Sequence, residues 1–211
     1  GYQLYHSILI DNTNGTDDKK SLRFVFSGGK TSVYSSPLKL NQRFAYNLKL
    51  NFKTLNVGAQ FNNELKFGLK TLDAKQKVIE TFEFSIADFS KSNQNWETTP
   101  TLRIEKIPDN THSCILFVEL SGRPSGRSIL WIDEVSIKSS PRIIFSTKAP
   151  LNIFQHDQIL NYKATIEGTV EDTNYTYALN VKDFRGNIID KEEEKFSGST
   201  NSTIIDKFVD K

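Results

Sequence analysis

The sequence contains no methionine and a single cysteine, Cys114. One cysteine cannot form a disulfide within the chain, and it begins the apolar run Cys114 to Val118, which is typical of a strand. We therefore expect a buried and inert thiol. Because even an initiator methionine is missing, we expect the chain to be a fragment with further sequence upstream.

A strong excess of one charge and long apolar runs are also missing. The 27 basic and 25 acidic residues are interspersed and leave a formal net charge of +2, too little to recruit nucleic acid. The apolar runs are only a few residues long, whereas roughly 20 are needed to cross a bilayer, and no basic start leads into a signal-peptide core. We expect no nucleic-acid partner, no membrane span, and a monomer or one part of a larger chain.

The sequence does contain enough apolar material for a core, because 37% of its 211 residues are hydrophobic and 15 are Phe. Apolar and polar residues alternate with period two throughout, and no stretch of eleven residues keeps a helical period. The chain is therefore predicted to be all-β.

The clearest alternation lies in residues 44–52. It predicts an inward set of Phe44, Tyr46, Leu48, Leu50 and Phe52, and an outward set of Ala45, Asn47, Lys49 and Asn51. The same pattern predicts strands at Leu22–Phe26, Glu64–Lys70, Val78–Phe84, Leu102–Glu105, Ile115–Leu120 and Ile129–Ile137. A short helical turn is predicted at Ile86–Ser92.

Ser139, Ser140 and Pro141 are predicted to form a linker, since two small polar residues and a proline end the last of these strands. They divide the chain into domains of residues 1–139 and 140–211. Alternation resumes at Leu160–Glu167 and Tyr175–Val181, with a hairpin turn at 183–187. The second domain has about 70 residues, fewer than the about 100 of an immunoglobulin-type sandwich.

The run Ile129–Ile137, ILWIDEVSI, resembles the last strand of jelly-roll carbohydrate-binding modules of the cellulose- and xylan-binding superfamily. Ser21–Phe24 and Val33–Leu48 resemble earlier strands of that family in the matching order. The resemblance covers about residues 5–138 and implies a jelly-roll β-sandwich. The usual Asn-Gly-x-Phe-Glu opening strand is not recognisable before Asp11.

The run Val181–Ile189 resembles the central hairpin of immunoglobulin-like domains that stand between binding modules and catalytic domains in large glycoside hydrolases. The second domain is accordingly expected to be an immunoglobulin-like β-sandwich that is either truncated or a smaller variant. Together the two resemblances imply a non-catalytic, carbohydrate-binding or accessory region of a secreted glycoside hydrolase or related protein, located outside the cell or on its surface. The alternative is a structural spacer or protein-interaction array that binds no sugar.

Asp133 is the candidate metal ligand, because modules that the first domain resembles hold a structural Ca²⁺ at this position. Trp131, Asp133, Val135 and Ile137 are predicted to share one face, which places a carboxylate beside apolar residues. A buried carboxylate needs a partner, and Ca²⁺ takes oxygen ligands. A hydrogen bond to a neighbouring loop, or a bulge that turns Asp133 outward, would satisfy it equally.

Tyr34 and Trp96 are the candidate sugar-stacking rings, and the expected partner is a polysaccharide or oligosaccharide. Each could instead pack in the core or against a loop. Lysines and asparagines, not further rings, occupy the predicted outward faces: Asn47, Lys49, Asn51, Lys66 and Lys70. This display suits either an acidic polysaccharide or an ordinary solvated surface.

Catalytic motifs are missing from the sequence. Its three histidines are scattered, and no nucleophile elbow or phosphate-binding loop occurs. Glu119 with Asp133 or Glu134 could form a glycosidase pair, but 25 acidic residues produce such pairs by chance. We expect no enzymatic activity from this chain.

Overall fold

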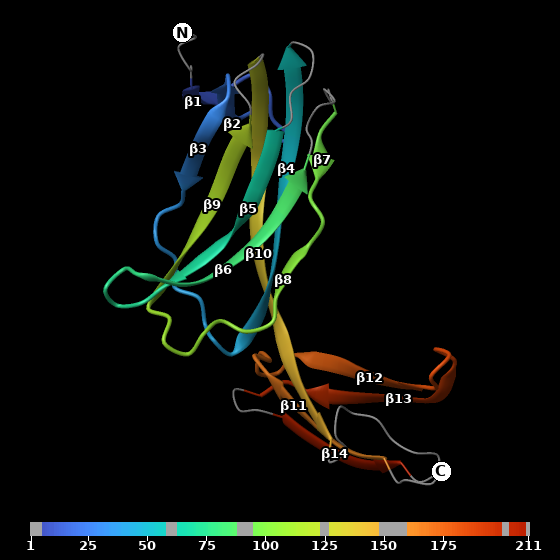
Figure 1. Cartoon of the computed structure of the whole chain (residues 1–211). Coiled ribbons are helices and arrows are strands. Elements are labelled where there is room, and N and C mark those ends of the chain that lie inside the picture. The colour runs from blue at the N-terminus through green and yellow to red at the C-terminus, as the bar shows by residue number, and fades with distance from the viewer. Residues whose placement is uncertain are drawn as a thin grey trace. The chain divides into compact units, whose positions relative to one another are not determined.

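The computed structural model describes residues 6–57, 63–87, 95–122, 127–147, 160–199 and 203–209. These residues form strands and connecting turns without a helix, which confirms the all-β prediction (Figure 1). The strands are β1 (His6–Asp11), β2 (Ser21–Phe26), β3 (Gly29–Tyr34), β4 (Phe44–Val57), β5 (Asn63–Leu72), β6 (Val78–Ala87), β7 (Glu97–Thr98), β8 (Leu102–Ile104), β9 (Ser113–Gly122), β10 (Arg127–Thr147), β11 (Leu160–Glu167), β12 (Asn174–Lys182), β13 (Ile188–Ser197) and β14 (Thr203–Val209).

The chain divides into two compact units, Gly1–Ser139 (unit 1) and Ser140–Lys211 (unit 2). The division falls at the predicted boundary, but the strand predicted to end there does not, because Ser139–Pro141 lie inside β10, which continues to Thr147. Pro141 comes immediately before Arg142↔Glu167, where the ladder with β11 begins. This pairing therefore does not need the N–H group that proline lacks.

Unit 1 consists of two antiparallel sheets. Sheet A has the order β1-β2-β10-β4, and the short strands β7 and β8 also pair with β4. Sheet B has the order β3-β9-β5-β6. Both sheets contribute to one core, whose members include Phe24 and Leu48 from sheet A and Phe67 and Leu120 from sheet B. Unit 1 is thus a β-sandwich, in which each sheet keeps one face toward the core and one face outward.

Strand β4 shows how the alternation builds this arrangement. The predicted inward residues Tyr46, Leu48 and Leu50 are all in the core, and Lys49 between them is exposed. Ala45 is the exception, because it is fully buried although its position in the alternation is outward.

Strand β10 departs from the predicted parity. Leu130 and Ile132 belong to the core, so Trp131 between them lies on the outer face of sheet A. Glu134 has a φ of 48°, a left-handed conformation that interrupts the alternation. The parity therefore changes between Ile132 and Ile137, and Ile137 packs against the core as predicted. Val135 is 44% exposed, not buried as predicted, and lines a cavity between the two sheets.

Two further expectations concern the ends of strands. An opening strand does exist before Asp11, because β1 pairs with β2 from His6↔Phe26 to Asp11↔Ser21. Of the predicted helical turn, Ile86 and Ala87 lie in β6, which makes this part of the prediction wrong. The remainder, residues 88–92, lies outside the described residues.

Unit 2 contains the end of β10, which pairs with β11, and β11 in turn pairs with β14. Strands β12 and β13 form a separate hairpin whose turn at Asp183–Asn187 was predicted, with Gly186 at a φ of 89°. The buried residues Tyr162, Ile166 and Tyr177 form the core of unit 2. The immunoglobulin-like identity of this unit stays a prediction.

Candidate functional site

Tyr34, one of the two predicted stacking residues, lies at the end of β3 in sheet B. Its neighbour Val33 packs against the core, so the Tyr34 side chain lies on the outer face of the sheet, where it is 49% exposed. Its cross-strand partner is Phe117 on β9, an aromatic residue on the same face. An exposed ring therefore stands beside a second ring on a sheet surface.

Phe117 is only 2% exposed although it faces outward, and Gly68 explains why. Gly68 is its cross-strand partner on β5. A Cβ atom at Gly68 would lie 3.0 Å from Cε1 of Phe117 and 2.0 Å from the backbone oxygen of Phe82. The missing side chain leaves room for the Phe117 ring to lie close to the sheet and form a floor beside Tyr34.

Lys70 holds these two rings together. Its Nζ lies 5.1 Å from the centre of the Tyr34 ring and 4.7 Å from that of Phe117. Both distances are within the range of cation–π attraction, which contributes about 0.5–1 kcal/mol at exposed sites. The ammonium group therefore lies over both rings and adds a positive charge to this aromatic group.

Charged pairs surround this aromatic group on the same sheet. Lys30 Nζ lies 2.9 Å from Glu119 Oε2, and Lys66 Nζ lies 3.0 Å from Glu83 Oε1. The hydrogen bond to Glu83 raises the pKa of Lys66, so this ammonium group stays charged. An aromatic ring bordered by fixed donors and acceptors can stack on the apolar face of a sugar and bond its hydroxyl groups.

Trp96, the second predicted ring, lies apart from this group in the topology. It is partly buried and directly precedes β7, which pairs with β4 of sheet A through Phe52↔Glu97. Tyr34 belongs to sheet B. The roles of both residues in sugar binding stay predictions, and a cavity of about 560 Å³ that Tyr34 helps to line does not include Trp96.

Phe117, Gly68 and Lys70 were not among the predicted site residues. Phe117 could have been found from the sequence. Leu116 and Val118 on either side of it pack toward the core, and an outward position between two such residues is usually polar, not aromatic. The role of Gly68 depends on which strand pairs with which, and the alternation within one strand does not encode that.

Asp133, the predicted metal ligand, is hydrogen-bonded to the loop between β1 and β2. Its Oδ2 accepts bonds of 2.8 Å from both N–H and Oγ1–H of Thr16, and its Oδ1 accepts one of 2.8 Å from N–H of Glu134. Burial raises the pKa of Asp133, but these hydrogen bonds outweigh that effect and lower it overall. Asp133 therefore anchors the loop as an ionised carboxylate, one of the two non-metal roles foreseen for it.

Trp131 provides a second anchor for the same loop. Its Nε1–H donates a hydrogen bond of 2.8 Å to Asp11 Oδ2, and Asp11 also accepts bonds from N–H and Oγ1–H of Thr13. Hydrogen bonds from Thr13 and Trp131 hold the pKa of Asp11 well below its ordinary value. The cations of Arg23 and Lys53 lie 5.9 and 5.4 Å from the Trp131 ring centre. The indole is thus covered on the outer face of sheet A and is not a stacking platform.

These contacts decide how far Asp133 suits Ca²⁺. Calcium needs six to eight oxygen atoms, whereas both lone-pair sites of Asp133 Oδ2 are already taken by Thr16. Within the part of the chain that the structure describes, no three His, Cys, Asp or Glu side chains converge as metal ligands. The described contacts fit a hydrogen-bonded loop better than a calcium ligand, and the calcium ion stays a prediction.

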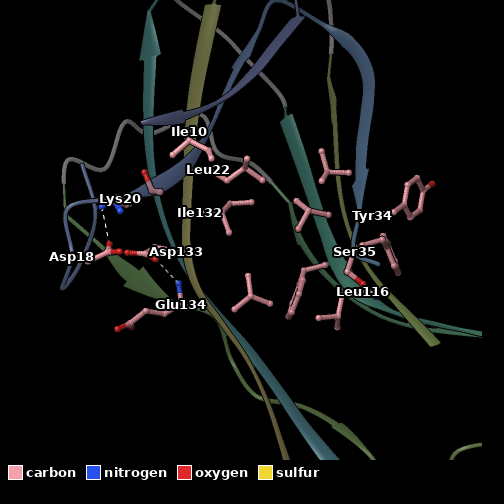
Figure 2. Close-up of a pocket in the computed structure, with 16 residues that line it drawn as sticks. Ile10, Asp18, Lys20, Leu22, Tyr34, Ser35, Leu116, Ile132, Asp133 and Glu134 are labelled. Atoms are coloured by element: carbon pink, nitrogen blue, oxygen red, sulfur yellow. Dashed lines mark hydrogen bonds between the residues drawn. The ribbon is translucent and has the colours of Figure 1, made fainter. Parts of the chain in front are cut away.

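A cavity of about 560 Å³ opens between the two sheets (Figure 2). Ile10, Leu22 and Ile132 line it from sheet A, and Leu116 lines it from sheet B. The charged residues Asp18, Lys20, Asp133 and Glu134 gather at one side, where Lys20 N–H bonds Asp18. Its walls are largely apolar, so it offers fewer partners for hydroxyl groups than the outer face of sheet B.

Residues considered for catalysis do not form a site. Glu119 belongs to sheet B and bonds Lys30, whereas Asp133 and Glu134 belong to β10 of sheet A. Cys114 is fully buried as predicted, and burial raises the pKa of its thiol to about 11.

Comparisons with known proteins show similarity in structure only. The sequence matches no protein-family profile, and it matches no curated protein. Similar solved structures include tailspike protein 4 of bacteriophage CBA120 (13% identity, TM-score 0.45) and the CBM22-1 and GH10 modules of xylanase 10B of Clostridium thermocellum in complex with xylohexaose (13%, 0.42). A CBM4 structure is also similar (14%, 0.33).

The first two similarities each cover 64% of this chain and the third covers 57%. The chain spans 18%, 25% and 84%, respectively, of those three chains. With every TM-score below 0.5, none of them assigns the chain to a family. Among the described residues no helix is long and apolar enough to cross a membrane.

Proposed function

We propose that unit 1 binds a polysaccharide or oligosaccharide through the outer face of sheet B and catalyses no reaction. The observation that supports this most directly is the half-exposed ring of Tyr34, held in place by Phe117 and Lys70. Tyr34 differs from a singly exposed ring such as Phe184 because a second ring lies beside it and charged hydrogen-bonding groups lie on the same sheet.

Binding would combine two contacts. The C–H face of a pyranose ring would stack on Tyr34, and the charged side chains of Lys70, Lys66 and Glu119 would bond its hydroxyl groups. These side chains already have partners that fix their orientation, so little conformational entropy is lost when sugar binds.

The wider role is proposed from the sequence resemblance of Ile129–Ile137. We place the chain in the accessory region of a secreted glycoside hydrolase or related polysaccharide-processing protein, outside the cell or on its surface. In this role unit 1 would hold the parent protein on its substrate. The Ca²⁺ predicted at Asp133 is not part of this proposal, because Thr16 already takes both lone-pair sites of Asp133 Oδ2.

The proposal is tested by affinity electrophoresis of the whole chain through gels that contain neutral or acidic polysaccharides. We expect the wild-type chain to be retained by at least one of them. Tyr34→Ala should raise the Kd for that polysaccharide about tenfold, whereas Tyr34→Phe, which keeps the ring, should be retained almost normally. Phe184→Ala is the matched control, since this ring is 92% exposed in unit 2. Trp96→Ala tests the other predicted residue.

Three results would contradict the proposal. Retention on no polysaccharide would favour the spacer or protein-interaction role. If Tyr34→Ala and Phe184→Ala reduce retention equally, the outer face of sheet B is not the binding site. Release of reducing ends from a retained polysaccharide by the purified chain would show that it is an enzyme.

A further inference from the structure

The lysines and asparagines that the sequence displays outward lie on two different faces. Lys66 and Lys70 belong to sheet B and are engaged, the first by Glu83 and the second by two aromatic rings. Asn47 and Lys49 belong to β4 of sheet A. The outer face of sheet A therefore needs its own explanation.

A polar groove of about 380 Å³ lies on that face. Its lining residues are Asn47, Lys49, Thr101, Ser136 and Lys138. They come together because β4 pairs with both β10 and β8, so that Ser136 and Lys138 arrive from one neighbour and Thr101 from the start of the other. The groove lies wholly within unit 1.

Two positive charges face this groove without a negative one. Its lining contains no carboxylate, and neither Lys49 nor Lys138 forms an ion pair among the residues that the structure describes. Of the carboxylates on the neighbouring strands, Glu105 pairs with Arg103 at 2.6 Å, and Glu134 accepts a hydrogen bond from the side chain of Asn51. The groove is thus a small site with a cationic lining on a chain with almost no net charge.

Neutral hydrogen-bonding groups complete the lining. Asn47 Oδ1 accepts a bond of 3.4 Å from Arg103, which turns the amide so that its Nδ2–H₂ group can donate elsewhere. Ser136 and Thr101 contribute hydroxyl groups, which both donate and accept. Two ammonium groups beside an amide and two hydroxyls match a ligand that carries one carboxylate and several hydroxyl groups.

We infer that this groove binds the carboxylate of an acidic polysaccharide, a polymer of uronic acid units, at a site separate from the aromatic face of sheet B. The inference rests on the proposed function for the kind of ligand, but not for the site. Nucleic acid fits less well, because its binding sites combine long rows of phosphate contacts with stacking rings, and the groove has neither.

The test uses polygalacturonate and the same polymer with its carboxylates methyl-esterified, which removes the charge and keeps the sugar. Lys49→Ala and Lys138→Ala are each expected to weaken binding to polygalacturonate about threefold and the double variant about tenfold, since exposed ion pairs contribute modestly. Binding to the ester should not change. Lys75→Ala/Lys77→Ala is the control, because it removes two exposed charges from the β5–β6 turn.

The outcomes separate this site from the proposed function. If the groove variant leaves polygalacturonate binding unchanged while Tyr34→Ala weakens it, the groove inference fails and the aromatic face stands. If the groove variant weakens binding and Tyr34→Ala does not, the groove inference stands and the aromatic face does not bind this polymer. No binding to polygalacturonate, or equally lysine-dependent binding to a single-stranded DNA oligonucleotide, would overturn the inference. Urea unfolding of each variant excludes loss of fold as the cause.

Discussion

Replacement of Asp133 by Asn decides whether this residue anchors the loop between β1 and β2 or binds a metal. The carboxylate accepts three hydrogen bonds of 2.8 Å, two at Oδ2 and one at Oδ1. An amide retains one acceptor oxygen, so in either orientation its NH₂ group faces an N–H donor of Thr16 or Glu134. We expect Asp133→Asn to lower the free energy of unfolding by about 1–2 kcal/mol. This is at the low end for hydrogen bonds to a charged group, because the site is partly exposed.

The assay is urea unfolding of wild type and Asp133→Asn at several pH values, with and without a chelator. Because the pKa of Asp133 is lowered by folding, its contribution is present above the ordinary value of 3.8 and is lost as pH falls through the lower folded value. The difference between the proteins should be full at pH 7 and shrink below about pH 4. Asp109→Asn, which removes an exposed partner of Lys106, should cost less than about 0.5 kcal/mol.

Two results would refute this reasoning. Equal stability of Asp133→Asn and wild type at pH 7 would show that the three hydrogen bonds do not hold the loop. A chelator that lowers the unfolding midpoint of wild type, but not of Asp133→Asn, would show that Asp133 binds a cation.

Three further predictions concern other residues of unit 1. Gly68→Ala should lower stability by about 1–3 kcal/mol, because its Cβ would lie 2.0 Å from the backbone oxygen of Phe82; an unchanged urea midpoint would contradict the packing described. Trp131→Phe removes the 2.8 Å bond to Asp11 and should lower the midpoint, whereas an unchanged midpoint would show that this anchor is dispensable. Cys114 should resist iodoacetamide at pH 8 and react fully in urea, since burial raises its pKa to about 11; rapid labelling of the native chain would disprove its burial.

Period-two alternation predicted the strands of the sandwich well, because one buried face is enough to fix the parity of a strand. In β4, Leu48 and Leu50 are buried and Lys49 between them is exposed, as predicted. The parity prediction was wrong at the start of β10, where Leu130 and Ile132 face the core and Trp131 does not, but it held at Ile137. The parity changes between Ile132 and Ile137, where Glu134 takes a left-handed conformation. A non-glycine residue rarely adopts this conformation, so the sequence gives no sign of the change.

The candidate site was harder to predict, because it depends on pairing between strands far apart in the sequence. Tyr34 could be proposed from its type, but its environment comes from Phe117 and Gly68, which β9 and β5 bring beside it. The outward lysines show the same limit. Within their own strands Lys49 and Lys70 look alike, yet Lys49 lines a polar groove and Lys70 contacts two aromatic rings.

The two proposed binding faces should act independently on short ligands. Each is the outer face of its own sheet, and packed sheets lie about 10 Å apart with their outer faces pointing away from each other. Free-energy effects of Tyr34→Ala and of the double variant Lys49→Ala/Lys138→Ala should therefore add for a short oligogalacturonate. A long polymer can reach both faces, so either change alone would also remove avidity and weaken its binding further. The test compares the affinity for the polymer with the affinity for the oligomer. If neither Tyr34→Ala nor Lys49→Ala/Lys138→Ala lowers this ratio, at most one of the two faces binds.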